Sequence, residues 1–476
     1  MRGQLVIDLP LHLDTSGDLG LTAQLVVGLR GLIDQGRLHH DDELPSTRAL
    51  AASLSVARGT VVAAYDQLQA EGYLTSRPGS GTRVAAVDAR RPVAGPSAPA
   101  PPAPQPDGRA IDLRPGTPDV SAIVSPPWRR AWREATNDPR PLIDARGLPS
   151  LRHEIAEHLR LMRSLVRPSD QVLVTSGARE GLALLLAALA RRGERPPLVG
   201  LERPGHPALA AIPTAMGLPT IALRTDDRGL VTEELPEAGS PTSHGPDVPT
   251  PDVIVVTPSH QYPYGGSLSI TRRQQLLGWA ARTGAIVVED DYDSELRYVG
   301  MPLPALATLD DPVRGRVVLL GTFSTVLTPA VATGYLSVPQ RLAPLVAGHR
   351  AIFGSPVPAL GQQALSNYLA SGELRRHIQR MRREYRRRRE LIVAAFRDAP
   401  HARLTDMSGG LQAVLRTNVP GSRITRRLAA RGVLVSDLAQ FWGPHAPAMD
   451  GIVFGFGSVD TPTLRHVLPI IRRACS

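Results

Sequence analysis

The sequence contains no lysine, although it is strongly basic. All 54 basic side chains among its 476 residues are arginine, and the formal net charge is +10. A GC-rich genome explains this bias toward arginine without any functional cause. The absence still has a chemical consequence, because no interior side chain offers a primary amine. A basic chain is compatible with binding to nucleic acid. Net charge alone, however, indicates only solubility and the electrostatic steering of charged partners.

Cysteine and long apolar runs are also scarce. Cys475 is the only cysteine, which excludes an internal disulfide bond. No apolar run is long enough to span a bilayer, and no charged-then-apolar leader follows Met1. We therefore expect a cytoplasmic protein with no membrane partner and no metal site. Apolar residues at 42% and charged residues at 21% are typical of a globular chain, and its length predicts two or three domains.

A Pro- and Ala-rich stretch divides the chain. Residues 86–110, above all 92–106, carry almost no large apolar side chains and predict a semi-rigid linker. At about 3.1 Å per residue, this linker spans up to about 75 Å. It separates a head, residues 11–85, from a body that we divide into a large domain, 111–345, and a small domain, 346–476. A second soft segment, 235–251, is expected to be a surface loop.

The body alternates short apolar runs with helical patterns. Continuous apolar strands between helices predict a mostly parallel sheet covered on both faces. The fold class is therefore α/β, with a smaller C-terminal α+β domain that includes the basic helical run 377–390 and ends in a helix. Strand candidates are residues 172–175, 198–201, 253–257, 285–289, 317–320 and 451–456, and helical patterns include 178–190 and 270–282.

The head carries the pattern of three helices and a hairpin. Ser46 is a candidate N-cap for a short second helix, and a third helix begins near Arg58 and ends at Gly72. Two strands, 73–76 and 82–85, flank the turn 77–81 and predict a β-hairpin wing. The expected buried residues are Leu21, Leu25, Leu29, Leu32 and Ile33 of the first helix, Ala49, Leu50 and Leu54 of the second, and Val61, Tyr65 and Leu68 of the third.

The third helix leaves Arg58, Gly59 and Thr60 exposed at its N-terminal end, where a recognition helix meets base edges and phosphates. Taken alone, this pattern also fits a small helical domain with solvated arginines. The string ELPSTRALAASLSVARGTVVAAYDQLQAEGYLTSRPGSGTRV, however, resembles the winged helix-turn-helix of the GntR family. At Ala57 some family members carry a polar residue, so base readout is not expected there. The resemblance implies double-stranded DNA as partner, with contacts from Arg48, Arg58, Thr60, Arg77, Ser80, Gly81 and Thr82.

Four segments of the body place polar groups after strands. A small-residue turn, 176–178, opens a helix whose N-terminal amides suit a phosphate. The run 289–293, EDDYD, follows a buried strand at the edge where open α/β sheets bind ligands, and a solvated acidic loop is its alternative. A carboxylate there can hold a protonated pyridine nitrogen. The remaining two segments are TPSHQYPYG, residues 257–265, and GTFST, residues 321–325.

In this order, the segments resemble the fold-type I aminotransferase domain of MocR/GabR-type regulators. The strings TPSHQYPYG, VEDDYDSELRY, GTFS and MRREYRRRRE carry the resemblance, which covers nearly the whole chain. It implies pyridoxal phosphate as cofactor, with Asp290 at the pyridine nitrogen and Tyr292 at the ring hydroxyl, and a homodimer paired head-to-tail. His206 takes the place of the family's stacking ring. The implied cofactor-site residues are Ser176, Gly177, Ala178, His206, His260, Asp290, Tyr292, Ser324 and Thr325.

The departures from the family concern the anchors of the cofactor. After GTFS the family has the lysine that bonds to pyridoxal phosphate, and this chain has Thr325. A phosphate-binding arginine seven residues later corresponds to Ala332, and a phosphate-binding tyrosine to Leu142. An oxygen nucleophile cannot form a Schiff base, and transamination needs the amine to move protons. The lost arginine contact alone is worth roughly 1.5–3 kcal/mol.

The sequence therefore predicts a sequence-specific DNA-binding transcription regulator without catalytic residues. Its body would dimerise and is a candidate site for a small-molecule effector. Two heads on long linkers would then reach paired half-sites. The alternative is a pyridoxal phosphate-dependent aminotransferase, against which the missing amine argues. Three states of the pocket stay open: noncovalent pyridoxal phosphate, a preformed cofactor–amino acid adduct, and an unrelated ligand or none.

Borohydride reduction in the presence of pyridoxal phosphate tests the missing amine. We expect mass spectrometry of the digested protein to find the reduced cofactor only on the N-terminal amine, because the chain offers no other primary amine. A lysine-containing aminotransferase treated in parallel controls for the reduction. An adduct on an interior residue of the native protein would contradict the prediction.

Overall fold

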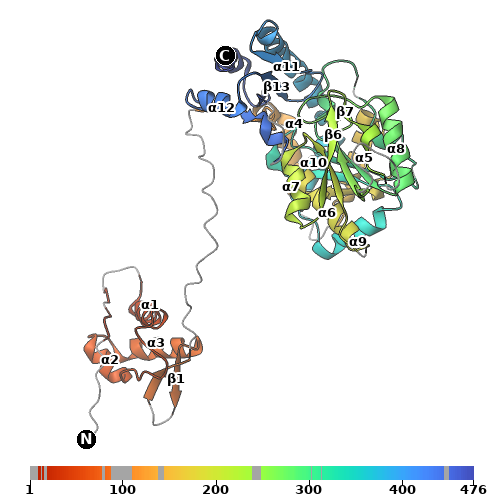
Figure 1. Cartoon of the computed structure of the whole chain (residues 1–476). Helices are drawn as coiled ribbons and strands as arrows, with labels where there is room; N and C mark the ends of the chain where they lie inside the picture. Colours follow the sequence, from red (N-terminus) through yellow and green to blue (C-terminus); the bar gives the residue numbers. More distant parts are fainter. Residues whose placement is uncertain are drawn as a thin grey trace. The chain divides into compact units, whose positions relative to one another are not determined.

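The computed structural model describes residues 9–476, except 12, 15–18, 78–80, 87–109, 138–143, 194, 238–247, 302, 312 and 444–449. The chain divides into two compact units, Met1–Gln105 and Pro106–Ser476, both drawn in Figure 1. The predicted linker lies almost entirely outside the described residues, and the predicted loop at 235–251 is described only at its two ends.

The first unit is a three-helix head with a two-stranded antiparallel sheet. Leu74 pairs with Val84, and Arg77 pairs with Gly81 next to the turn. The predicted helices and hairpin are confirmed, with both strands shifted by one residue toward the turn. The elements are α1 Leu21–Asp34, α2 Thr47–Ser53, α3 Arg58–Ala70, β1 Leu74–Arg77 and β2 Gly81–Val84.

The short helix α2 differs from the prediction in one buried position. Leu50 and Ala51 are buried and Leu54 is half-buried, whereas Ala49 is exposed. The prediction of Ala49 as a core residue is wrong. Leu50, Ala51 and Leu54 lie on the side of the helix that faces the core. Ala49 lies outside this side, so it faces solvent.

Two local contacts position α2 against α3. The Ser46 hydroxyl oxygen accepts a hydrogen bond from the Ala49 amide at 3.2 Å, as the predicted N-cap requires. The Tyr65 hydroxyl of α3 donates to the Pro45 carbonyl oxygen at 3.0 Å. Beyond α3, Gly72 takes a left-handed φ of 82°, which glycine adopts without steric cost. The Tyr65 hydrogen bond thus ties the segment before α2 to α3.

The second unit is built on an eight-stranded sheet with the order β4-β11-β10-β9-β8-β5-β6-β7. Strands β10, β9, β8, β5 and β6 are parallel, while β11 runs antiparallel to both β4 and β10. The predicted mostly parallel sheet is confirmed. The strands are β4 Val172–Thr175, β5 Val199–Arg203, β6 Thr220–Asp226, β7 Gly229–Leu230, β8 Val253–Val256, β9 Ile286–Asp291, β10 Val317–Thr322 and β11 Gly334–Ser337.

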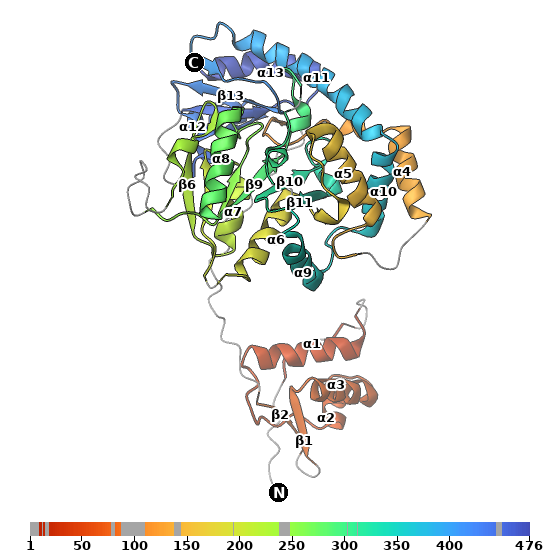
Figure 2. The same cartoon turned by 90° about the vertical axis from the view of Figure 1, so that its right-hand side faces the viewer.

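Helices cover both faces of this sheet, as Figure 2 shows. Successive strand residues point to opposite faces, so Val317 and Leu319 join one apolar cluster and Val318 and Leu320 the other. Helices α5 and α8 contribute to the first cluster, and α6, α7 and α9 to the second. The helices are α4 Pro126–Thr136, α5 Pro149–Arg163, α6 Ala178–Ala190, α7 Pro207–Ala215, α8 Ile270–Thr283 and α9 Ala343–Phe353.

The C-terminal part adds a four-stranded antiparallel sheet with the order β12-β13-β16-β15. The predicted last strand and C-terminal helix are confirmed as β16 and α13. Strand β3, at the start of the unit, pairs with β14. The elements are α10 Ala359–Ala370, α11 Glu373–Phe396, α12 Gly421–Ala429, α13 Thr461–Ala474, β3 Ile111–Asp112, β12 Ala402–Leu404, β13 Gln412–Thr417, β14 Val433–Leu434, β15 Ser436–Asp437 and β16 Gly451–Gly455.

Three strands of the large sheet went unpredicted: β6, β11 and the two-residue edge strand β7. β6 lies next to the sheet edge and buries only Leu223, so it shows no continuous apolar run. β11 has four residues and enters the sheet antiparallel between β4 and β10, a placement that no local pattern encodes. Among the helices of the described residues, none combines the length and apolar character that a bilayer crossing needs.

A buried leucine of α1 tests whether the two units unfold separately. Leu29 is fully buried in the head, whereas Val27 of the same helix is 58% exposed. We expect Leu29→Ala to lower the free energy of unfolding of the head by about 2–5 kcal/mol and to leave the transition of the body unchanged. Val27→Ala, the control, should change either transition by less than about 0.5 kcal/mol. Calorimetry of the full chain measures both, and an equal shift of both transitions would contradict the prediction.

Candidate functional site

The candidate nucleic-acid interface begins at the first turn of α3. Arg58 is the first residue of the helix and is exposed, as is Gly59, while Thr60 is half-buried. The N-cap residue Ala57 makes no side-chain cap, and the Thr60 amide donates to the Ala57 carbonyl oxygen at 3.0 Å, so the amides of Arg58 and Gly59 stay available to an external acceptor such as a phosphate. Arg48, in the first turn of α2, is exposed as well.

The wing contributes two described candidate residues. Gly81 is exposed and Thr82 is half-buried, both on β2. Arg77 ends β1, but its side chain and the whole of Ser80 lie outside the described residues. The sequence analysis missed Arg83, the residue after Thr82 on β2. Its guanidinium lies 2.9 Å from a carboxylate oxygen of Glu43. This ion pair ties the wing to the segment before α2.

The large sheet brings the candidate cofactor residues to one edge. Strands β4, β5, β8, β9 and β10 share one direction, so the residues that follow them lie at a common carboxyl edge. Ligands of open α/β sheets bind at this edge. The predicted residues found there are Ser176, Gly177, Ala178, His206, His260, Asp290, Tyr292, Ser324 and Thr325.

The acidic segment at the end of β9 is buried. Glu289, Asp290 and Asp291 are 1%, 4% and 6% exposed, which excludes the solvated acidic loop that the sequence also allowed. Because side chains alternate along a strand, Glu289 and Asp291 share one face and Asp290 points to the other. On the first face, Arg163 of α5 lies 3.4 Å from Glu289 and 3.1 Å from Asp291.

Asp290 carries a buried carboxyl group without a partner. Neither of its oxygens accepts a hydrogen bond from any described residue. Burial, and then the charge of neighbouring carboxyl groups, raises the pKa of Asp290 well above its usual value. A ligand with a cationic N–H group would supply the missing donor, as a protonated pyridine nitrogen does. The neighbouring carboxyl groups are those of Asp291, Asp293 and Glu202.

Tyr292 and His260, predicted from two separate segments, meet in one hydrogen-bonded network. His260 Nδ1 lies 2.8 Å from Tyr292 Oη and 2.8 Å from Asp293 Oδ2. The Tyr292 hydroxyl also donates to the His260 carbonyl oxygen at 3.0 Å and accepts from Gln412 Nε2 at 3.2 Å. Burial raises the pKa of Tyr292 well above its usual value, so the hydroxyl keeps its proton. Gln412, on β13, belongs to the C-terminal sheet, and no sequence motif marks it.

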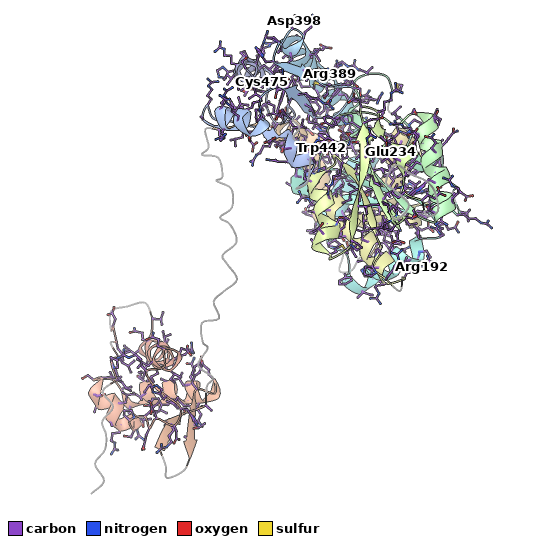
Figure 3. All side chains as sticks on the ribbon, in the orientation of Figure 1. Arg192, Glu234, Arg389, Asp398, Trp442 and Cys475 are labelled. Carbon is purple, nitrogen blue, oxygen red and sulfur yellow. The ribbon has the colours of Figure 1, made fainter. Side chains whose placement is uncertain are left out.

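Aromatic rings line the same edge. The His206 ring packs 4.8 Å from the Tyr262 ring, which meets the Tyr292 ring edge-on at 5.4 Å. Burial and the charge of Arg179 lower the pKa of His206 to about 4, so its imidazole is neutral near pH 7. Trp442, labelled in Figure 3, packs beside this cluster from the C-terminal part of the chain. Tyr262 stands inside a quoted motif, yet the sequence analysis did not single it out.

The positions of the family's cofactor anchors make no hydrogen bond to this network among the described residues. The Ser324 amide donates to Thr322 Oγ1 at 3.1 Å. Thr325 is half-buried, and within the described residues no hydrogen bond joins it to the network of Tyr292 and His260. Ala332 is exposed and takes a left-handed φ of 42°. Leu142 lies outside the described residues.

The turn expected to cradle a phosphate holds a glutamate instead. Residues 176–178 connect β4 to α6, and Gly177 takes a φ of 105° that side-chain-bearing residues rarely adopt. The Ser176 amide donates to Glu180 Oε2 at 3.0 Å. Glu180 Oε1 accepts from Arg350 Nη2 at 2.7 Å. The sequence analysis missed both Glu180 and Arg350, because 170 residues separate them along the chain.

Known proteins resemble this chain in both units. The family described as bacterial regulatory proteins, gntR family, matches residues 21–84, and aminotransferase class I and II matches residues 111–444. The HTH-type pyridoxine biosynthesis transcriptional regulator PdxR of Corynebacterium glutamicum is 44% identical over 99% of this chain and 100% of its own length. The chain belongs to the GntR family of transcriptional regulators.

A second regulator and a solved structure also resemble this chain. The probable rhizopine catabolism regulatory protein MocR of Rhizobium meliloti is 34% identical over 98% of this chain and 95% of its own length. A solved archaeal alanine:glyoxylate aminotransferase matches 76% of this chain and 90% of its own with a TM-score of 0.68 and 21% identity. This likeness confirms the predicted fold of the body, and the family confirms the prediction of a DNA-binding transcription regulator.

We expect Asp290 to make the stability of the body depend on pH. Because its folded-state pKa is raised above 3.8, its stabilising contribution is complete below about pH 4 and is lost as the pH rises through the raised value. Asp290→Asn keeps the size and removes the charge. We therefore expect the variant to unfold with a free energy about 1–3 kcal/mol higher than the wild type at neutral pH.

The difference should shrink toward pH 4, where the wild-type carboxyl group is protonated. Thermal unfolding at both pH values measures it. Asp227→Asn is the matched control, since that side chain is 86% exposed and partly paired with Arg416 at 3.4 Å. A wild type more stable than Asp290→Asn at neutral pH would contradict the prediction.

Proposed function

We propose that this regulator binds double-stranded operator DNA through its head. The exposed, uncapped first turn of α3 carries the proposal, because Arg58 stands there beside free amide groups. We assign Arg48 on α2, which is exposed, and Thr82 on the wing, which is half-buried, to the same DNA-binding surface. Base edges would be read from the start of α3, and the wing would contact the backbone. The proposed contacts are Arg48, Arg58, Thr60, Arg77, Ser80, Gly81 and Thr82.

The body is the proposed dimerisation domain, with two subunits paired head-to-tail. Ile352 and Phe353, neighbours at the end of α9, are 60% and 73% exposed. Large apolar side chains exposed side by side favour association with another surface. A dimer would present two heads on long linkers to paired half-sites and so raise the effective affinity.

The pocket at the carboxyl edge is proposed to bind its effector without a covalent bond. Asp290 offers an unpaired buried carboxyl group to a protonated ring nitrogen, and Tyr292 and His260 offer polar groups beside it. The absence of lysine leaves no side-chain amine for the covalent bond or for transamination. Pyridoxal phosphate supplies an electron-withdrawing ring when bound, but this chain lacks the group that would use it. We therefore expect no aminotransferase activity.

The ligand class is suggested by a relative and by the fold. The Corynebacterium regulator is named for pyridoxine biosynthesis, and the body has the fold of an aminotransferase. A vitamin B6 compound is therefore the first ligand to test. A preformed cofactor–amino acid adduct would use the same ring contacts, so calorimetry with pyridoxal phosphate and with its reduced amino acid conjugates distinguishes the two.

Replacing Arg58 tests the operator interface. We expect Arg58→Gln to weaken binding to the DNA upstream of its own gene by about 1–3 kcal/mol, or to lower the salt slope by about one if the contact is to a phosphate. Arg37→Gln, an exposed arginine of the head that follows α1, makes the same charge change as a control. Fluorescence polarisation at several salt concentrations measures both. Equal losses in the two variants, or no sequence preference in the wild type, would contradict the proposal.

A further inference from the structure

A groove of about 890 Å³ lies at the amino edge of the large sheet, at the opposite end of its strands from the proposed effector pocket. Strands β5, β8, β9 and β10 are parallel, so their first residues meet at this edge. Val253 and Ile286, which begin β8 and β9, line the groove together with Arg316, the residue before β10. Clefts that bind small molecules typically measure about 300–1,000 Å³. The groove is therefore large enough for a small ligand.

Four arginines line this groove. Arg192, labelled in Figure 3, follows α6, Arg195 lies before β5, Arg316 precedes β10 and Arg341 lies before α9. Among the described residues that line the groove, Asp252 is the one acidic residue, and its two carboxylate oxygens accept from Arg195 at 2.8 and 2.9 Å. No ion pair joins the other three arginines to any described carboxylate. Three positive charges are therefore left unbalanced.

Backbone carbonyl groups hold two of these guanidinium groups in place. Arg316 Nη1 donates to the Gly284 carbonyl oxygen, and Arg341 Nε donates to the Gly315 carbonyl oxygen at 2.9 Å. Each guanidinium keeps further N–H groups for an external acceptor. Burial, and then the positive charges of Arg316 and Arg192, lower the pKa of Arg341. The arginines thus repel one another, and a bound anion would relieve this repulsion.

The surroundings of the arginines leave their positive charge in excess. The charge of Asp310 opposes the lowering of the pKa of Arg341. Its carboxylate, however, accepts hydrogen bonds from the amides of Arg316 and Val317 at 2.6 and 2.7 Å. Helix α9 begins beside the groove, since its N-cap residue Leu342 lines it and makes no side-chain cap. The positive end of a helix dipole also favours an anion.

The groove has an apolar floor beneath the arginines. Val253, Ile286 and Leu342 are buried, whereas the arginines are exposed or half-buried. A guanidinium pairs with phosphate oxygens and also stacks on flat rings. The groove therefore offers donors to phosphate groups and an apolar surface to the uncharged part of an organic molecule. An inorganic anion would use only the donors.

We propose that this groove is a second ligand site, which binds a small organic polyphosphate such as a nucleoside triphosphate. Its phosphates would contact Arg192, Arg316 and Arg341, and its ring would cover the apolar floor. A DNA duplex presents its phosphates on a convex backbone and would leave this floor uncovered, so the floor favours a small ligand. The site depends neither on the proposed effector pocket nor on the DNA-binding surface of the head.

Calorimetry of the full chain with ATP, inorganic triphosphate and adenosine, all without Mg²⁺, tests the proposal. We expect ATP to bind more tightly than inorganic triphosphate, which cannot cover the apolar floor, and adenosine to show no measurable binding. The double variant Arg192→Gln/Arg341→Gln should bind ATP at least about tenfold more weakly than the wild type. Both side chains are exposed, so we expect the fold to tolerate their replacement.

Two further variants separate this site from general attraction of anions to a basic chain. Arg423→Gln makes the same kind of charge change at an exposed arginine of α12, outside the groove, and should bind ATP as the wild type does. Asp252→Asn should bind ATP about threefold more tightly or better, because it removes the negative charge beside Arg195. A structural role of these residues alone would not produce a gain in affinity.

Three outcomes would overturn the proposal. The first is a wild type that does not bind ATP, or that loses the same affinity in Arg423→Gln as in the double variant. The second is equal affinity for ATP and inorganic triphosphate, since the groove would then select charge alone. The third is a loss of affinity for the DNA upstream of its own gene, measured by polarisation, that equals the loss for ATP in the double variant. The groove would then contact the DNA backbone.

Discussion

A buried arginine ties helix α5 to the carboxyl edge of the large sheet. Arg163 reaches from α5 to two carboxylates of β9, Glu289 and Asp291, and donates to Ser259 Oγ at 2.9 Å just beyond β8. Removing one partner of a buried ion pair costs about 3–5 kcal/mol, so this group strongly constrains the strand. Because side chains alternate along β9, fixing these two carboxylates on one face directs Asp290 to the other, toward the proposed ligand.

The proposed pocket holds buried carboxyl groups. Burial raises the pKa of Glu202 to about 7, and that of Asp290 rises well above its usual value. A ligand with a protonated ring nitrogen would complement Asp290, whose oxygens accept no hydrogen bond among the described residues. This charge pattern needs no covalent anchor, which is consistent with a chain that has no lysine.

Under the proposed function, the body keeps the aminotransferase fold without its chemistry. The sheet order and the covering helices of the aminotransferase fold depend on apolar packing across two large clusters. Neither cluster needs the amine at the position of Thr325. A threonine in place of the family's lysine would remove covalent catalysis without disturbing either cluster. In a regulator, such a pocket is suited to binding a ligand rather than converting it.

The sequence by itself determined the features that rest on short-range spacing. The helix-turn-helix head, with Ser46 as a cap and Gly72 after its third helix, follows from contiguous residues, as do the apolar strands of the body and the missing amine. Only the tertiary structure decided which distant groups meet. Gln412 joins Tyr292 across 120 residues, and Arg350 joins Glu180 across 170. It also decided that Ala49 is exposed and that the EDDYD segment is buried. The physical reason is that local periodicity indicates which face of a helix or strand is apolar. Strand order and helix packing decide which distant residues that face contacts and which residues come together at the edge of the sheet.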